Sequence, residues 1–251
     1  MPSFAAKTSS PAFALPPGFQ LVSLRESGDA FAHACRIAPE SGAGTFVSVG
    51  RFDVLEFAVV LEPEEPLVSA RRGFFAGMVA IADALASFAP PEKPITFTWP
   101  DTVHFDGGRL GGARLGWPEG CAEDEVPDFL VFGAMLLASP VGQRDTGLLP
   151  EVTFLEEEGF DPQEHNSIVE SFARHILVAF DLWNERGFDA IAGNYLARLP
   201  AGAGETRRAL DTNGDLLLHR NGALIRVALL GSLQDVSWLD RKTGLPRLVS
   251  R

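Results

Sequence analysis

Apolar and polar positions alternate with a period of two along several short stretches of this chain. Within residues 54–61, apolar side chains at odd positions face one side, and the even positions, Glu56 among them, face the other. Such alternation is typical of a strand that buries at least one face. Alternation and short apolar runs together predict strands over residues 45–50, 54–61, 95–99, 110–117, 129–138 and 148–155.

Other stretches repeat apolar side chains at spacings of three and four, which predicts helices. In residues 73–88 this repeat forms one amphipathic face, and two prolines follow its end. The longest repeat, residues 166–186, begins with a capping box formed by Ser167 and Glu170. The predicted helices cover residues 27–38, 73–88, 166–186 and 189–199.

The order of these elements predicts the fold class. Strands and helices are largely segregated along the chain, which is typical of an α+β fold. We expect a mixed or largely antiparallel sheet flanked by helices, followed by a small β-rich domain with a hairpin around Asn221 and Gly222. The predicted parts are a flexible N-terminal arm (residues 1–17), the main domain (residues 18–200) and a C-terminal domain (residues 205–251).

The acidic balance of the chain narrows the partners that it can have. Its 33 acidic and 21 basic residues give a net charge of −12, which repels the phosphates of nucleic acids. No run of 18 or more apolar residues is present, so we expect no membrane-spanning helix. The first residues lack the pattern of a secretory signal peptide, and a reducing cytoplasm is the default expectation. The oligomeric state stays open.

Cysteine and acidic positions give no sign of a metal site. Cys35 and Cys121 lack the spacing of metal ligands. Cys121 stands beside carboxylates, which disfavour the thiolate and so argue against a nucleophile. Residues 211–215 begin like a calcium loop, but Gly222 stands where the loop requires a bidentate glutamate. We therefore expect a turn at residues 211–215 and no bound metal there.

The segment most informative about chemistry joins a hydroxyl-lined strand to a glycine-rich turn. Thr96 and Thr98 share one face of the predicted strand, and Trp99 faces the other way. The two parts read Thr98-Trp99-Pro100-Asp101-Thr102 and Gly107-Gly108-Arg109-Leu110-Gly111-Gly112. This pair resembles the signature of the biotin and lipoate protein ligases, which carry a lysine where this chain has Thr98. Further segments that resemble the family, in the same order, are residues 42–45, 60–63, 72–77, 126–133 and 172–199.

The resemblance implies a fold, a reaction and a set of site residues. A protein of this kind binds biotin, lipoate or octanoate with ATP and magnesium, and transfers the acyl group to a lysine of a biotinyl or lipoyl carrier domain. Thr98 and Arg109 would orient the carboxyl or phosphate group, with Arg109 at a lysine position of the family. A glycine loop would cover the ligand, although Ala43 here replaces an arginine. The ligand-binding residues that the resemblance implies are Gly42, Gly44, Thr45, Thr96, Trp99, Asp101, Gly111 and Gly112.

The missing lysine leaves several hypotheses open. The chain could be an acyl-transfer enzyme, and an acyl thioester donor in place of ATP would account for the lost phosphate contacts. It could be a catalytically degenerate, ligase-like binding protein, or an interaction protein that acts through its C-terminal domain. Arg109 could bind an anion bidentately or be a solvated turn residue. The two arginine pairs, at residues 71–72 and 207–208, could bind an acidic carrier domain or could only make the surface more soluble.

Overall fold

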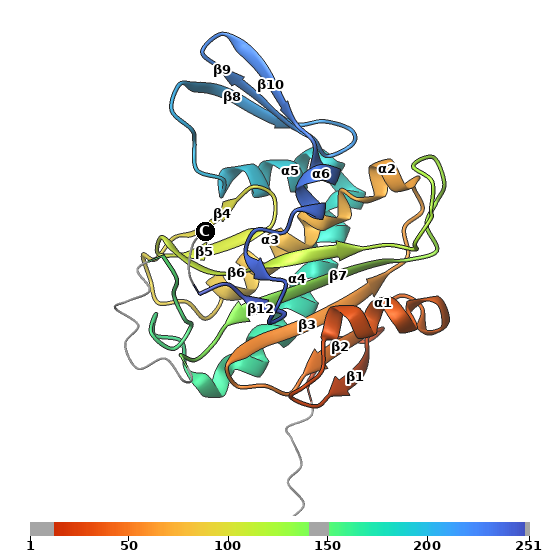
Figure 1. Ribbon diagram of the computed structural model, residues 1–251, viewed down its shortest axis with the longest axis vertical. Coiled ribbons are helices and arrows are strands. Elements are labelled where there is room, and N and C mark those ends of the chain that lie inside the picture. Colours follow the sequence, from red (N-terminus) through yellow and green to blue (C-terminus); the bar gives the residue numbers. More distant parts are fainter. Residues whose placement is uncertain (1–12, 141–150, 249–251) are drawn as a thin grey trace, which may run out of the picture.

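A seven-stranded mixed sheet forms the centre of the molecule (Figure 1). The structure, a computed structural model, describes residues 13–140 and 151–248. The strands are β1 (Gln20–Leu24), β2 (Thr45–Val49), β3 (Val54–Leu61), β4 (Ile95–Thr98), β5 (Thr102–Phe105), β6 (Gly108–Gly116) and β7 (Leu130–Leu137). Their order is β1-β2-β3-β7-β6-β5-β4, and only the β1–β2 pair of this sheet is parallel. The predicted α+β fold class, with a mixed sheet flanked by helices, is confirmed.

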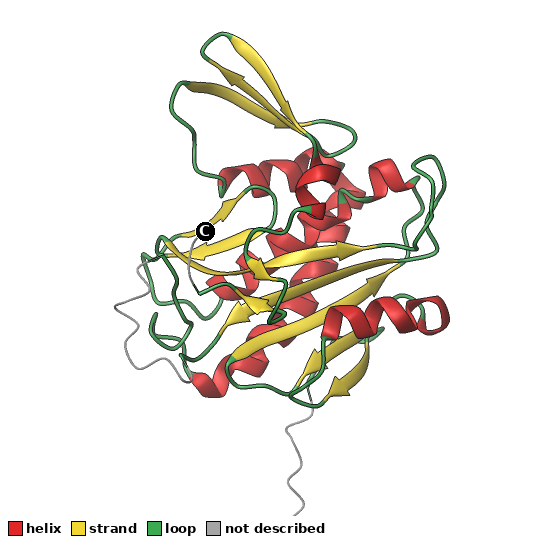
Figure 2. Cartoon of the chain, in the orientation of Figure 1, coloured by secondary structure: helices red, strands yellow, loops and turns green. Residues whose placement is uncertain are grey.

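One face of the sheet is covered by three helices, α3 (Gly73–Ala86), α4 (His165–Arg186) and α5 (Phe188–Ala197) (Figure 2). α3 is not the amphipathic helix that its spacing predicts, because α4 and α5 pack against it and all of its residues except Asp83 and Ala86 are buried. Gly77 permits this burial, since a Cβ there would lie 2.3 Å from the Phe132 ring. The helix layer and the sheet together form the main hydrophobic core. Two short helical turns, α2 (Leu67–Ala70) and η2 (Pro162–Glu164), precede α3 and α4.

The other face of the sheet is covered by α1 (Ala30–Ser41) over part of its area. The predicted start at residue 27 is wrong by three residues, because the side chain of Asp29 accepts a hydrogen bond from the Ala32 N–H (2.8 Å) and caps the helix. Beside α1, this face is covered by the last described segment of the chain, which contains β11 (Leu239–Asp240) and β12 (Leu245–Pro246).

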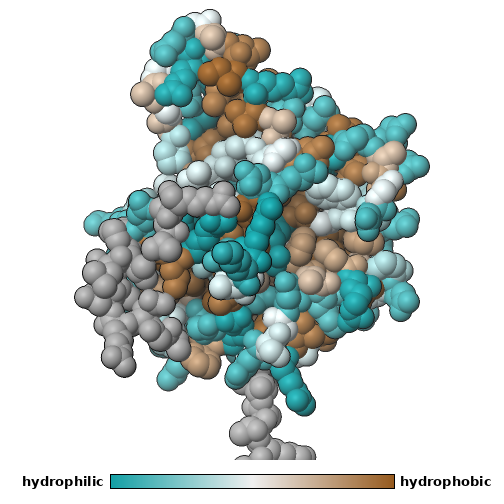
Figure 3. Space-filling model, in the orientation of Figure 1, coloured by the Kyte–Doolittle hydropathy of each residue, from teal (hydrophilic) through white to brown (hydrophobic). Residues whose placement is uncertain are grey.

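A second, three-stranded antiparallel sheet projects from the body (Figure 1). It contains β8 (Glu205–Leu210), β9 (Leu216–Arg220) and β10 (Ala223–Val227), so the hairpin around Asn221 is confirmed. Apolar surface is visible on this sheet, where Leu224 and Ile225 are exposed (Figure 3). The short helix α6 (Leu229–Gln234) then returns the chain to the body. The domain boundary between residues 200 and 205 stays a prediction.

Several local predictions are wrong for identifiable reasons. Strand β5 is absent from the prediction, which joins residues 95–99 directly to residues 110–117 and gives no element to residues 102–105, because those four residues are too few to show a pattern between two turns. The strand predicted at residues 148–155 falls partly outside the described residues, and residues 151–155 form only an isolated bridge between Arg109 and Val152. The predicted capping box is also wrong: α4 begins at His165, and Glu170 accepts a hydrogen bond from the Ala14 N–H instead.

Other predictions can be compared directly. The turn at residues 211–215 is present, held by hydrogen bonds from two backbone N–H groups to the Asp211 side chain. Residues 1–12 of the predicted N-terminal arm lie outside the described residues. Within the described ranges, none of the helices is both long and apolar enough to cross a bilayer.

Candidate functional site

The sheet face that is covered by α1 and by the C-terminal segment carries most of the polar side chains that could form a functional site. Cross-strand partners in a sheet point to the same side, so the register places one row of residues across six strands. The row contains Glu56 of β3 between two apolar neighbours, and its other end reaches the hydroxyl face of β4. In order across the sheet it reads Val49, Glu56, Met135, Gly112, Thr102 and Thr98.

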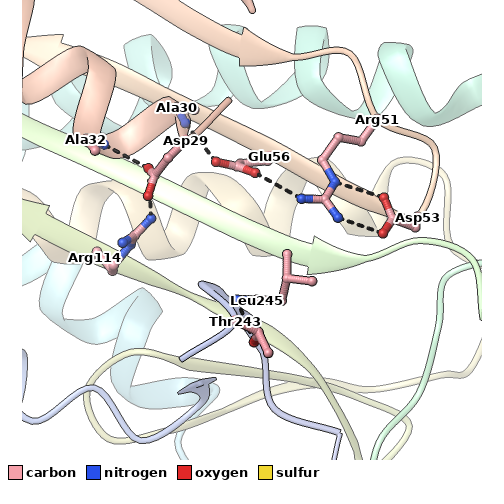
Figure 4. A network of polar contacts seen from close by, with 9 residues as sticks. All are labelled: Asp29, Ala30, Ala32, Arg51, Asp53, Glu56, Arg114, Thr243 and Leu245. Carbon is pink, nitrogen blue, oxygen red and sulfur yellow. Dashed lines mark hydrogen bonds and ion pairs between the residues drawn. The ribbon is translucent and has the colours of Figure 1, made fainter. Parts of the chain in front are cut away.

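A carboxylate–guanidinium network occupies the α1 side of this face (Figure 4). Arg51, in the β2–β3 turn, donates two hydrogen bonds to Asp53 (2.8 and 2.7 Å), and its guanidinium lies 4.0 Å from Glu56. Arg114 of β6 forms an ion pair with Asp29 at 3.4 Å. Both guanidinium groups are therefore already paired with carboxylates, which leaves less positive charge for a phosphate than two free arginines would.

Glu56 is the buried centre of that network. It is 3% exposed, and its Oε1 accepts a hydrogen bond from the Ala30 N–H at the start of α1 (2.7 Å). Its Oε2 is buried and has no hydrogen-bond partner. Burial, partly offset by the Ala30 N–H, raises the pKa of this carboxyl group. Glu56 can therefore hold or accept a proton on this face.

A second acidic group, Asp101, lies at the other end of the face. It is 1% exposed, and the Thr102 hydroxyl donates a hydrogen bond to its Oδ1 (3.1 Å). Burial raises the pKa of Asp101 to about 7, and the Thr102 hydrogen bond and the nearby Trp238 indole oppose that rise. The Asp101 Oδ2 and the Trp238 indole nitrogen nevertheless remain buried without a hydrogen bond. The pKa suits Asp101 to proton transfer near neutral pH.

The turn that carries Asp101 is fixed from the helix side. The Tyr195 hydroxyl donates a hydrogen bond to the Pro100 carbonyl (2.8 Å), and the Trp99–Pro100 peptide bond is cis. Trp99 packs against Phe75 and Tyr195, so it faces the helix layer and not the row. Trp99 therefore packs under the turn on its helix side and does not line the candidate site.

Arg109, Thr98 and Thr96 occupy the β4–β6 end of the face. One guanidinium nitrogen of Arg109 donates a hydrogen bond to the Arg247 carbonyl (2.7 Å), while its Nε is buried and unpaired. Burial lowers the pKa of Arg109 from its ordinary value. Thr98 Oγ1 lies 3.0 Å from His104 Nε2, and Thr96 stands opposite His104 in the register. Burial also lowers the pKa of His104, which favours its neutral form.

The predicted glycine loop lies at a different place. Gly42 ends α1 with a positive φ of 74°, and the Gly44 N–H donates to the Val60 carbonyl (3.0 Å). Val60 pairs with Val131 and so belongs to the end of the sheet away from Gly112. Thr45 opens β2 at that same end. The structure thus brings together Thr96, Thr98, Asp101, Arg109, Gly111 and Gly112, and it places Gly42, Gly44 and Thr45 elsewhere.

The loop at the end of the sheet that carries the row is the β2–β3 turn, residues 50–53. Its Arg51, together with Glu56, Asp29 and Arg114, was absent from the sequence prediction. A signal was available for Glu56, which is the one charged residue of an otherwise apolar strand. Arg114 and Asp29 meet only through the fold and give no comparable local signal. Within the described ranges, no group of histidine, cysteine and acidic residues is arranged to hold a metal ion.

The comparison of sequences identifies a family. The sequence model described as the biotin/lipoate A/B protein ligase family matches residues 15–197 of this chain. No curated protein matches the chain significantly.

Solved structures share the fold. A biotin protein ligase-like protein of unknown function from Silicibacter sp. TM1040 is 27% identical, with a TM-score of 0.76 over 88% of this chain and 99% of that one. The apo biotin protein ligase from Aquifex aeolicus is 16% identical, with a TM-score of 0.63 over 83% and 95%. The complex of the Aquifex aeolicus ligase with biotin and ATP gives 16% identity and a TM-score of 0.60 over 83% and 95%. The similarity to the Aquifex aeolicus structures is a similarity of fold.

Proposed function

Because the chain belongs to the biotin/lipoate A/B protein ligase family, we propose that it binds a biotin-, lipoyl- or octanoyl-type acyl group for transfer to a lysine of a carrier protein. The binding surface is the sheet face that carries the row from Glu56 to Thr98. The observation that supports this most is that Thr98 and the turn of Asp101 lie beside Gly112 in the register, on the same sheet face that carries Arg109 farther along β6. The Aquifex aeolicus ligase of the same fold has been solved with biotin and ATP.

Arg109 is the cation that we assign to this face in place of the family lysine. An arginine stays charged and can hold a carboxylate or a phosphate with two parallel hydrogen bonds. Its unpaired Nε leaves part of that capacity unused. Thr98 and His104 supply further polar atoms at the same end of the sheet. Arg109 would hold the carbonyl oxygen or carboxyl group of the ligand, and Thr98 would orient it.

The donor that fits these residues best is an acyl thioester. Arg51 and Arg114 are paired with carboxylates, and the family lysine is replaced by Thr98, so these positions offer little positive charge to a triphosphate. In transfer, the carrier amine attacks the acyl carbon and the C–S bond breaks. Asp101 accepts the amine proton, and the thiolate leaves. The pKa of Asp101, about 7, allows that proton transfer near neutral pH.

Mass spectrometry of a carrier domain tests this function. The chain is incubated with an apo biotinyl or lipoyl domain and either octanoyl thioester or biotin, lipoate or octanoate with Mg-ATP. We expect an acylated carrier with the thioester, and about 100-fold slower transfer by Arg109→Gln. Arg174→Gln, at an exposed position of α4, is the matched control and should leave the rate unchanged. No acylation with any donor would overturn an enzymatic role, and acylation with Mg-ATP alone would overturn the thioester assignment.

A catalytically degenerate binding protein is the second candidate. Two observations favour it: the Arg109 guanidinium donates a hydrogen bond to the Arg247 carbonyl, and Trp238 covers Gly112. Such a protein would bind one of the acids or acyl groups saturably and transfer none of it. Binding measured beside the transfer assay separates the two functions.

A further inference from the structure

Residues 235–248, which we call the C-terminal strap, cross the sheet face that carries Gly112 and Arg109. The strap follows α6 and contains the two-stranded pair of β11 and β12. We propose that the strap is an autoinhibitory cover, which occupies part of the acyl-binding face and must lift before a ligand can reach Arg109. The inhibitory role rests on the proposed function.

The first observation is the position of Trp238. Its side chain is fully buried, and a Cβ on residue 112 would lie 2.4 Å from its indole nitrogen. The indole therefore fills the space that the glycine leaves open beside Asp101. The cluster that surrounds it joins strap residues to the sheet and contains Val54, Met135, Leu137, Phe154, Trp238 and Leu239. A ligand that approached the backbone at Gly112 would have to displace Trp238.

The second observation is that the strap accepts a hydrogen bond from Arg109, the cation that we assign to the binding face. The Arg109 guanidinium donates a hydrogen bond to the backbone carbonyl of Arg247 (2.7 Å). A carbonyl oxygen carries only a partial negative charge, so a carboxylate would be the stronger partner for a guanidinium. A ligand that carries a carboxylate would therefore compete with the strap for Arg109.

The third observation is that the closed arrangement leaves polar atoms unpaired. Asp101 Oδ2, Trp238 Nε1 and Arg109 Nε are all buried without a hydrogen bond. Buried polar atoms in folded proteins are nearly always paired, and each exception carries a desolvation cost. These three gather where the strap meets the sheet. Of the three, the Trp238 indole is close enough to Asp101 to lower its pKa, whereas Arg109 Nε has no hydrogen-bond partner within the described ranges, and opening the interface returns Arg109 Nε to water or to a ligand.

The fourth observation is that the strap forms more hydrogen bonds within itself than with the sheet. Within the strap, the Arg247 N–H donates to the Trp238 carbonyl (2.7 Å), and the Arg247 Nε donates to the Leu239 carbonyl (2.9 Å). Among the described residues, one hydrogen bond joins the strap to the sheet, the bond from Arg109 to Arg247. Figure 4 shows strap residues Thr243 and Leu245 in the same close-up as the network of Glu56. The strap can therefore lift as a unit without breaking a strand pairing of the sheet.

Amide hydrogen exchange of the ligand-free protein measures this opening. We expect the Arg247 amide of the strap to exchange at least about ten-fold faster than the Ala113 amide of β6, which is bonded to the Asp101 carbonyl. Trp238→Ala should speed exchange in the strap further and leave β6 protected, whereas Trp238→Phe, which keeps an apolar ring, should bring strap exchange back toward the wild-type rate. Trp117→Ala is the matched control beyond the end of β6 and should not alter the strap. Equal protection of strap and sheet in the wild type would overturn the proposal.

Ligand binding provides the second arm of the test. For the acid or octanoyl thioester that the wild type binds, Trp238→Ala should lower the Kd by about five-fold or more, because closure no longer competes with binding. Saturation with that compound should speed exchange at Arg247. A ligand that leaves strap exchange unchanged, or that binds Trp238→Ala no better than the wild type, would overturn the proposal while the proposed function stands. If neither protein binds any acyl compound, the proposed function fails and the inhibitory role fails with it.

Discussion

The indole nitrogen of Trp238 lies 2.4 Å from the place that a Cβ of residue 112 would occupy. Trp238 can therefore occupy its position only because residue 112 of β6 has no side chain. Gly112 leaves the backbone of β6 uncovered by a side chain on the face that also carries Arg109, and the Trp238 indole fills that space. The packing of Trp238 and the binding of a ligand in the proposed function both use the space beside Gly112.

Substitution of that glycine should therefore be costly. In Gly112→Ala the new methyl group meets Trp238 and also the Asp101 carbonyl, at 2.5 Å, so both must move. We expect a loss of about 1–3 kcal/mol in the free energy of unfolding, measured with urea. Trp238→Ala in the same background should recover part of the loss.

Gly193→Ala is the control for this substitution. Gly193 lies in α5, and a Cβ there would meet no other atom within 4 Å. Its replacement should raise the free energy of unfolding by up to about 1 kcal/mol, because alanine favours helix. Equal effects of the two substitutions would contradict the packing described for Gly112.

The pKa of Asp101 should make stability depend on pH. The folded pKa, about 7, is above the ordinary value, so the folded state binds more protons than the unfolded state between about pH 4 and pH 7. The contribution of Asp101 to the free energy of unfolding should fall across that window, by up to about 4 kcal/mol. Asp101→Asn cannot titrate and keeps an acceptor for Thr102. The difference in unfolding free energy, Asp101→Asn minus wild type, should rise with pH and level off above pH 7.

Charged and titratable neighbours of Asp101 could also contribute to the pH dependence of stability, so the comparison must hold them constant. Tyr195 and Asp235 lie close enough to influence or be influenced by its charge, the Thr102 hydroxyl donates a hydrogen bond to it, and the Trp238 indole lies nearby. These groups are the same in both proteins, so the difference isolates Asp101. A difference that stays constant from pH 4 to pH 8 would show that Asp101 has the same pKa in the folded and unfolded states, which contradicts the raised pKa.

The Glu56 carboxyl group should contribute to the stability of α1. Glu56→Ala removes the acceptor of the Ala30 N–H and leaves that donor buried, so we expect a loss of about 1–3 kcal/mol in urea unfolding. Glu56→Gln keeps an acceptor at nearly the same place and should lose less. If both variants lose the same amount, the hydrogen bond to Ala30 is not what Glu56 supplies.

The strands and helices that form the core followed from local pattern. Alternation and apolar runs located β2, β3 and β7 within a residue or two, because each is a continuous buried strand in the middle of the sheet. The burial of α3 on nearly all sides could not be predicted from local pattern. Its sequence shows an amphipathic repeat, and its burial on nearly all sides depends on two helices that come about 80 residues or more later in the chain.

The candidate site was predictable only in part. Thr98, Asp101, Arg109 and Gly112 belong to two neighbouring segments, so a local motif could locate them together. Trp238 covers Gly112 from more than 100 positions away, and no local pattern carries that information. The resemblance to the ligase family puts the glycine loop at residues 42–45, although the register puts residues 50–53 at the end of the sheet that carries Gly112.

Isothermal titration calorimetry of Arg109→Gln tests the central claim most directly. Wild type, Arg109→Gln and the control Arg174→Gln are each titrated with biotin, lipoate, octanoate and octanoyl thioester. We expect one of these compounds to bind wild type and Arg174→Gln alike and to bind Arg109→Gln at least about ten-fold more weakly. Equal binding to all three proteins would place the ligand away from this face, and an absence of binding to any of them would contradict the proposed function.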